Sequence, residues 1–268
     1  MKTFISILTV AVFSLFFNEN LSAQNPDNDY VIVEYMKVKP GMTDKYLECE
    51  KVWKLIHQER KKAGLIIGWE IEEMMYPSGT SSEYDYLTIT HLKNWDAIGK
   101  LEASWDDKTW AMLTKNLTAA QKETANNAPL YRDLVKREIW TAGDMVFAPG
   151  RKNQKYRVEN FMSIPDGGWD EWTETESKFV KPVHEKNIAK GNRAGWLMGF
   201  MVLPRGGDSP YQASTVDLFN TWEDMNKNEG QAWKEVYPDM SDDRIWKRIE
   251  ATRTIVKTEV RRLVDFVE

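Results

Sequence analysis

The sequence contains one pattern twice, and this repeat limits the folds that the chain can adopt. Residues 52–96 align with residues 179–223 at a shift of 127 positions, and twelve of the 45 pairs are identical. Average composition would give about three identities by chance. The identical pairs are Lys54/Lys181, His57/His184, Gly64/Gly191, Gly68/Gly195, Trp69/Trp196, Met74/Met201, Pro77/Pro204, Gly79/Gly206, Ser82/Ser209, Tyr84/Tyr211, Thr88/Thr215 and Trp95/Trp222. We infer that the chain is a duplication of one structural unit.

The match continues on both sides after small changes of shift. The shift is 126 residues upstream and 121 residues downstream. These flanks add the pairs Met36/Met162, Gly41/Gly167, Asp44/Asp170, Glu48/Glu174, Glu50/Glu176, Arg132/Arg253, Val135/Val256, Lys136/Lys257 and Glu138/Glu259. A Pro-Gly pair and a polar stretch at 148–155 indicate a linker. We therefore predict one repeat at 24–150 and a second at 151–268.

Within one repeat the pattern predicts four strands and two helices. Apolar residues at helical spacing predict a helix over 44–62 that ends at Gly64, and a second helix begins near Asn94. Stretches rich in β-branched and aromatic residues predict strands at 30–38, 66–76, 84–92 and 134–141. The order β-α-β-β-α-β is the ferredoxin-like motif, so we predict an α+β fold made of two such units.

The second strand of the second repeat is apolar on both of its faces. It reads WLMGFMVL over Trp196–Leu203. A strand of this kind is buried on both sides, whereas a single ferredoxin-like unit leaves one face of its sheet bare. We therefore expect the two antiparallel sheets to pack together as a fused barrel, which makes the chain an intramolecular pseudo-dimer.

This organisation resembles the dimeric α+β barrel superfamily, in which we note antibiotic-biosynthesis-monooxygenase-like, NIPSNAP-like, haem-degrading and chlorite-dismutase-like proteins. The resemblance covers both repeats and rests on element order, duplication and the repeated spacing of His, Gly-Trp, Tyr and Trp. It implies a barrel centre of packed side chains and a ligand cleft between the sheet and the helices of each half. A shared fold does not by itself define function.

Two histidines are the candidate catalytic residues. His57 and His184 occupy equivalent positions near the end of the first helix of each repeat, and the chain has only three histidines. A histidine on the face of a helix that packs on a sheet can act as a general base or as an axial haem ligand. The alternative is a structural histidine at a helix end, where its charge is favoured.

Repeated aromatic residues are the candidate ligand-binding residues. If their side chains point toward the helices, they line an aromatic cleft with a tyrosine hydroxyl as its polar group; the alternative is ordinary core packing. The candidates are Trp53 in the first helix, Trp69 and Trp196 at the start of the second strands, and Tyr84 and Tyr211 at the start of the third strands.

Arginines precede the last strand of each repeat. Arg132 and Arg253 are candidates for binding a ligand carboxylate at the mouth of the cleft, and the alternative is a pair of solvated edge charges. Pro182 lies in the first helix of the second repeat and has no counterpart in the first. Because proline disturbs a helix interior, we expect the two clefts to differ in shape.

The N-terminus predicts export to the periplasm or the exterior. Lys2 precedes a mostly apolar run at 4–17, and Ser22 and Ala23 follow it, so we expect residues 1–23 to be a signal peptide. The run is shorter than the roughly 20 residues that span a bilayer. Cys49 is the only cysteine, so no intramolecular disulfide can form.

The net charge and the missing motifs exclude several classes of partner and of reaction. The net charge of −5 argues against nucleic acid and anionic membranes as partners. No phosphate-binding loop, zinc motif or nucleophile elbow occurs in the sequence. We expect a small apolar or aromatic ligand, no metal and no cofactor, and the fused units can dimerise again. Three functions stay open: ligand binding with or without a cofactor-independent monooxygenase-like reaction, haem binding through His57 or His184, and a non-catalytic envelope module.

Overall fold

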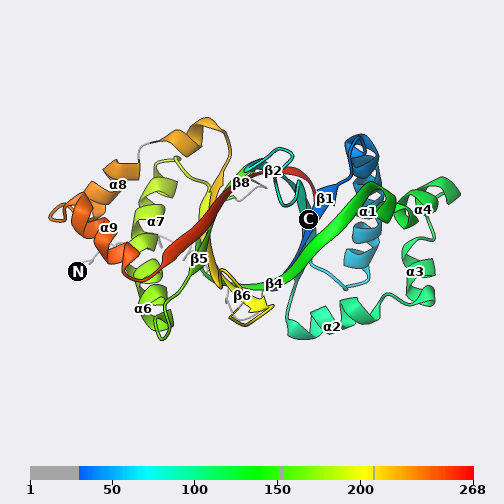
Figure 1. Ribbon diagram of the computed structural model, residues 1–268, viewed down its shortest axis with the longest axis horizontal. Helices are drawn as coiled ribbons and strands as arrows, with labels where there is room; N and C mark the ends of the chain where they lie inside the picture. The colour runs from blue at the N-terminus through cyan, green and yellow to red at the C-terminus, as the bar shows by residue number, and fades with distance from the viewer. Residues whose placement is uncertain (1–29, 151–153, 208, 228) are drawn as a thin grey trace, which may run out of the picture.

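The computed structural model describes residues 30–150, 154–207, 209–227 and 229–268. In this part of the chain, eight antiparallel strands close into one barrel, and helices pack against two opposite sides of it (Figure 1). The expected signal peptide at 1–23 and part of the expected linker lie outside the described residues.

The first half follows the predicted order, with additional short helices before its last strand. Gly64, which has φ +70°, follows the first helix as expected for a residue in the left-handed region. The elements are β1 (Tyr30–Val38), α1 (Thr43–Lys62), β2 (Gly68–Tyr76), β3 (Tyr86–Leu92), α2 (Trp95–Ala103), α3 (Asp107–Leu113), α4 (Ala119–Asn126), α5 (Ala128–Tyr131) and β4 (Arg132–Phe147).

The second half repeats this order but interrupts its first helix. A π-helical segment, η2 (Thr175–Val180), separates two α-helical segments, and Pro182 lies in the first turn of the second one. The predicted disturbance at Pro182 is therefore confirmed. The elements are β5 (Tyr156–Ser163), α6 (Trp169–Glu174), η2, α7 (Lys181–Ala189), β6 (Gly195–Leu203), β7 (Ala213–Phe219), η3 (Glu223–Asn226), α8 (Glu229–Val236), α9 (Asp242–Glu250) and β8 (Thr254–Val267).

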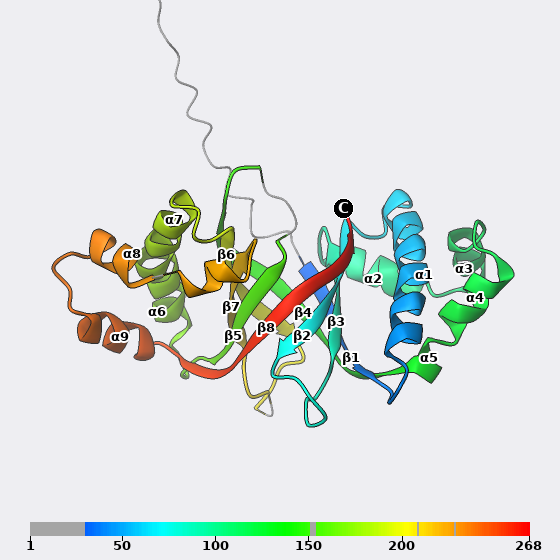
Figure 2. The ribbon, with the colours of Figure 1, turned by 90° about the horizontal axis from the view of Figure 1, so that it is seen from above.

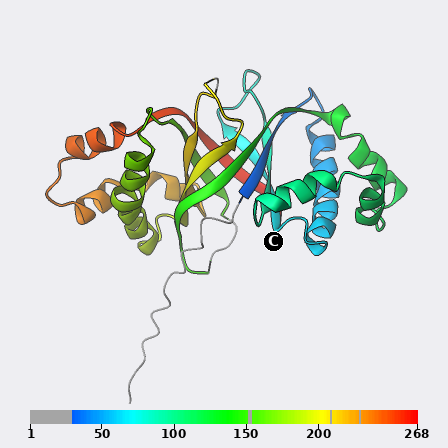
Figure 3. The same ribbon diagram turned by 90° about the horizontal axis from the view of Figure 1, so that it is seen from below.

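The two halves join along two seams. The strand order around the barrel is β1-β3-β2-β8-β5-β7-β6-β4, so β2 pairs with β8 and β4 pairs with β6. The predicted fused barrel is confirmed, but the two sheets continue into each other edge to edge instead of lying face to face. Helices α1–α5 flank one half and α6–α9 the other (Figure 2). The β2–β3 and β6–β7 hairpins project from the same end of the barrel (Figure 3).

Alternation along each strand separates a lumen face from a helix-facing face. In β1, Ile32 and Met36 pack in the cluster under the helices, whereas Val33 and Tyr35 pack inside the barrel. Successive side chains of a strand point to opposite faces, so both faces of each sheet are buried. This explains why Trp196–Leu203 is apolar throughout.

Candidate functional site

A cleft of about 90 Å³ lies between the helix-facing side of the first sheet and α1. Trp53, His57 and Arg60 lie on one face of α1 because they are separated by four and three residues. We call this space the first cleft. It is lined by Glu34, Met36, Glu50, Trp53, His57, Arg60, Trp69, Thr88, Thr90, Leu101, Trp105, Arg132 and Arg137.

His57 lies flat on Trp69 in this cleft. The ring centroids are 4.8 Å apart and the planes differ by 13°. His57 is 6% exposed, and its Nδ1 atom has no hydrogen-bond partner among the described residues. Burial and the nearby charge of Arg60 hold the pKa of His57 well below its usual value. The imidazole is therefore neutral at neutral pH.

Two arginines, the buried Arg60 and the partly buried Arg132, have buried nitrogen atoms to which no other group in the described part of the chain is hydrogen-bonded. Arg60 is 3% exposed, and these atoms are its Nε and Nη2. Its guanidinium lies 4.4 Å from the ring centroid of Trp105 and 5.7 Å from that of Trp53. Burial lowers the pKa of Arg60 to about 10, so the group still carries its charge at neutral pH. In Arg132 the corresponding atom is the buried Nε.

The carboxylates of the first cleft do not neutralise these arginines completely. Glu34 lies 3.3 Å from Arg137, which also lies 2.6 Å from Glu102. Burial raises the pKa of Glu50 to about 7, although the charge of Arg132 opposes this rise. At neutral pH, Glu50 is therefore close to half protonated, and the cleft has a surplus of positive charge.

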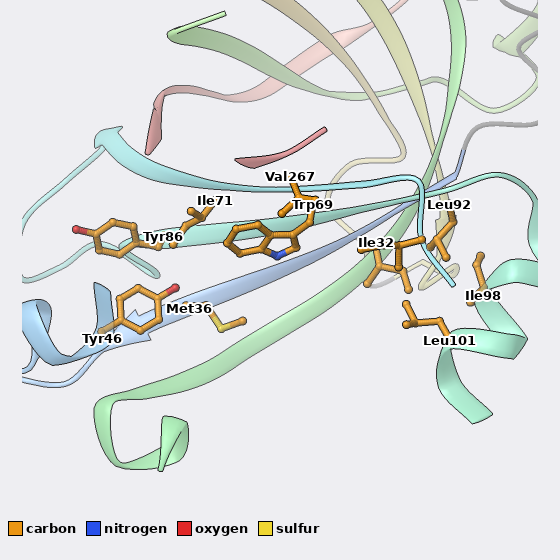
Figure 4. Packing of buried hydrophobic residues seen from close by; sticks show 11 residues of the cluster. Ile32, Met36, Tyr46, Trp69, Ile71, Tyr86, Leu92, Ile98, Leu101 and Val267 are labelled. Atoms are coloured by element: carbon orange, nitrogen blue, oxygen red, sulfur yellow. The ribbon is translucent and has the colours of Figure 1, made fainter. Parts of the chain in front are cut away.

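The floor of the first cleft is part of a packed core. Trp69 and Met36 lie on the same helix-facing surface of the sheet, and Tyr46 of α1 faces Tyr86 of β3 beside them (Figure 4). The two tyrosine rings are 5.2 Å apart. This packing holds the indole of Trp69, and therefore the ring of His57, in a fixed position.

The equivalent histidine of the second half has charged side chains beside it. His184 lies on Trp196 with a centroid distance of 5.0 Å and an interplanar angle of 12°. Arg193 hydrogen-bonds to Nδ1 of His184 and forms a 3.0 Å ion pair with Asp217. At a shift of 127 residues, Arg193 and Asp217 replace Ile66 and Thr90 of the first half. The predicted difference between the two clefts is thus present.

Arg132 and Arg253 also differ in environment. Arg132 lines the first cleft, whereas Arg253 forms an ion pair with the fully buried Glu176. Burial lowers the pKa of Arg253 to about 10. Arg253 is therefore engaged within the protein and does not offer its charge to a ligand as Arg132 does.

Tyr84 and Tyr211 do not line the clefts with the histidines, which corrects that expectation. Both pack inside the barrel. Tyr84 donates a hydrogen bond to Glu259, and Tyr211 donates one of 2.7 Å to Glu138. The third strands begin at Tyr86 and Ala213, two residues later than predicted, so strand alternation does not set the direction of these tyrosines.

The structure thus brings His57, Trp53, Trp69 and Arg132 together in the lining of one cleft. It adds residues that the sequence interpretation missed, chiefly Arg60, Glu50 and Trp105. Two signals were present in the sequence. Arg60 lies three residues after His57 on the same helix face, and Glu50 has a counterpart of the same charge in the other repeat.

Neither histidine has the surroundings of an axial haem ligand. An axial ligand needs a free ring nitrogen that faces a large open space. His184 accepts from Arg193 at Nδ1, so its neutral ring carries the proton on Nε2 and has no lone pair for iron there, and its ring face is covered by Trp196. His57 faces the first cleft, whose volume of about 90 Å³ is well below the roughly 300 Å³ of the smallest typical pockets for drug-sized ligands. The residues as they stand do not fit a haem.

Among the described residues, no group of three or more His, Cys, Asp or Glu side chains is arranged to hold a metal ion. In the same part of the chain, no helix combines the length and the apolar character that crossing a membrane requires.

Comparison with known proteins supports the fold. A candidate monooxygenase of Fusobacterium nucleatum subsp. nucleatum superposes with a TM-score of 0.53 at 9% identity, covering 89% of this chain and 94% of that protein. A second candidate monooxygenase, from Lactobacillus acidophilus, gives 0.51 at 11% identity, covering 88% and 93%. A mutant chlorite dismutase of Candidatus Nitrospira defluvii gives 0.50 at 9% identity, covering 88% and 92%.

These likenesses establish the architecture and no more. The fold is that of the dimeric α+β barrel proteins, with both halves of the barrel in one chain. No protein-family model matches the sequence, and no curated protein matches it. The NIPSNAP-like branch of the resemblance stays a prediction.

Proposed function

We propose that the protein binds a small organic anion with an aromatic or apolar body in the first cleft. One observation carries the proposal: Arg60, Arg132 and His57 each have a nitrogen atom that no described residue satisfies, and all three residues line one space with indole walls. Leaving a buried charged donor unsatisfied is costly. A carboxylate accepts several hydrogen bonds at once and pairs well with a guanidinium, so it would satisfy the arginines.

The aromatic wall accounts for the body of the ligand. Trp105 is 53% exposed and stands beside Trp53, with ring centroids 6.0 Å apart. A cavity of about 90 Å³ has room for a carboxylate and a few more atoms. In this pose a flat ring would extend from the cavity toward Trp105. The candidate monooxygenases of the same fold are consistent with a small ligand in general. Their sequence identities of 9–11% carry no information about the residues of this site.

A second candidate function is proton abstraction from the bound ligand. It rests on the neutral state of His57 and on the pKa of about 7 of Glu50. Groups whose protonation changes near the working pH are effective acids and bases. In this form of the proposal the carboxylate of Glu50 accepts the proton, because its pKa lies near neutral pH, and the neutral imidazole of His57 hydrogen-bonds the ligand. A cofactor-independent monooxygenase-like reaction would begin with that step.

The binding test is calorimetric titration with benzoate and phenylacetate, beside benzyl alcohol as the uncharged comparator. We expect the acids to bind saturably. Arg60→Gln should weaken their binding about tenfold or more, since hydrogen bonds to charged groups contribute roughly 1.5–3 kcal/mol, and it should leave any binding of benzyl alcohol unchanged. Arg244→Gln, at an exposed position of α9, changes the net charge equally and is the matched control. Equal losses in both variants, or no saturable binding, would refute the proposal.

A further inference from the structure

A second cavity lies in the lumen of the barrel. Its volume is about 150 Å³, and residues from all eight strands line it. Apolar side chains form much of its wall, including Trp140, which is 5% exposed. These apolar residues are Val31, Val33, Ile89, Trp140, Ala142, Met145, Phe147, Leu197 and Val216. The lumen cavity is separate from the first cleft, because its lining residues point to the opposite face of the sheet.

The two halves have diverged at equivalent positions around this cavity. At the repeat shifts of 126, 127 and 121 residues, apolar side chains of one half correspond to charged side chains of the other. The register agrees, since Val31 is paired with Trp140 and Arg157 with Arg261. The pairs are Val31/Arg157, Val33/Glu159, Leu197/Glu70, Gly199/Glu72 and Trp140/Arg261.

These positions place an apolar wall opposite a charged wall. The apolar members lie on the neighbouring strands β1, β4 and β6, and the charged members lie on β2, β5 and β8. The two seams lie on opposite sides of the ring of strands (Figure 1). Val33 and Gly199 are smaller than their counterparts Glu159 and Glu72, so the apolar wall leaves open space in the lumen.

The charged wall is a chain of ion pairs with a hydrogen bond at one end. Nε2 of His91 lies in hydrogen-bond contact with Glu70 at 2.9 Å, and Glu70 lies 2.5 Å from Arg157. Arg157 continues to Glu72 at 2.6 Å, Glu72 to Arg261 at 3.2 Å, and Arg261 to Glu159. Each charge therefore already has a counter-charge. A charged ligand would lose its hydration without gaining a free partner, which is unfavourable.

Size and polarity together define the ligand class. An engineered apolar cavity of about 150 Å³ in another protein binds benzene. The lumen cavity has the same size, but one of its walls can donate and accept hydrogen bonds. Val31, Met145 and Phe147 are partly exposed at one end of the barrel, and the side chain of His91 is 35% exposed there, which gives a route of entry.

We infer that the lumen binds a neutral single-ring aromatic alcohol, with the ring on the β1–β4–β6 wall and the hydroxyl toward the Glu70–Arg157 ion pair. This site is independent of the anion-binding cleft. The two sites are predicted to separate their ligands by charge: anions bind outside the sheet, and neutral phenols bind inside the barrel.

The test is a titration of the protein with 4-fluorophenol, followed by fluorine NMR, with phenol as competitor. We expect a saturable shift that phenol reverses. Val33→Phe fills the lumen and should weaken binding about tenfold or more. His57→Gln alters only the first cleft and should change the affinity by less than about twofold.

A second variant decides the matter if Val33→Phe does not fold. Val216→Ala enlarges the cavity, so the preference for 4-ethylphenol over phenol should rise about fivefold or more. The inference is overturned if the wild-type protein shows no saturable shift, if Val33→Phe binds like the wild type, if His57→Gln abolishes binding, or if Val216→Ala leaves the preference unchanged.

Discussion

Tyr211 donates a 2.7 Å hydrogen bond to Glu138, a residue of the other half of the chain. Its repeat counterpart Tyr84 makes the reciprocal bond to Glu259. Each tyrosine therefore crosses between the halves, and burial together with the glutamate charge raises the pKa of both phenols. The repeated tyrosines are explained by the joining of the two halves and not by a ligand.

The two glutamates differ in the number of other hydrogen bonds that they accept, which gives a matched pair of variants. Glu138 also accepts from Tyr35 at 2.8 Å and from Trp140 at 3.0 Å. Glu259 keeps one other bond, which Lys257 donates to Oε1 at 2.7 Å, and no described residue bonds to its Oε2, because Phe161 stands where the first half has Tyr35. Tyr211→Phe should therefore lower the free energy of unfolding by about 1 kcal/mol and Tyr84→Phe by about 2 kcal/mol. Denaturant unfolding measures both, and the reverse order would contradict this account.

Glu50 should cost the protein stability at neutral pH. Its folded-state pKa of about 7 lies above the ordinary value of 4.5. The unfolded state releases this proton more easily, so stability falls as the pH rises from about 4.5 to about 7. At 1.36 kcal/mol per unit, the loss approaches about 3 kcal/mol. Glu50→Gln should recover much of this at pH 8 and little at pH 4, as seen by unfolding at the two pH values. An equal change in the free energy of unfolding at pH 4 and pH 8 would refute this explanation.

The same carboxyl should make anion binding depend on pH. Above about pH 7, Glu50 is ionised and repels an anion in the first cleft, whereas below this pH it is neutral. The dissociation constant for benzoate should therefore fall about threefold or more from pH 8 to pH 6. Glu50→Gln should bind benzoate equally at both pH values. A wild-type affinity that is constant with pH would contradict this expectation.

Haemin should not bind through either histidine. Nδ1 of His184 is occupied by Arg193, and the space beside His57 is small. Titration with haemin should give no saturable Soret band, and the double variant His57→Ala/His184→Ala should behave like the wild type. A sharpened band that the double variant loses would restore the haem hypothesis.

We propose that the protein is exported and loses residues 1–23. This rests on the sequence pattern alone. Mass spectrometry of the protein recovered outside the cytoplasm should give a chain that begins at Gln24. Recovery of the uncleaved chain from the cytoplasm alone would reject export.

The fold was largely predictable because it was encoded twice. Equivalent glycines, tryptophans and histidines at a constant shift marked the same turns and core positions in both halves. The candidate site was predictable in part. Helical spacing brought Trp53 and His57 together, and these local rules hold wherever the chain forms regular structure. Tyr84 escaped them because it lies outside its strand.

The sequence by itself determined the duplicated unit, the strands with two buried faces and the repeated pairing of His57 and His184 with the tryptophans that follow them. Local periodicity and repeat identity carry that information. Only the tertiary structure decided that Arg193 bonds to the histidine of the second half while Arg60 and Arg132 line the first cleft. It also decided that Val33 and Glu159 stand on opposite walls of one lumen. These relations join residues far apart in the chain, and barrel closure creates them through pairings that no local pattern specifies.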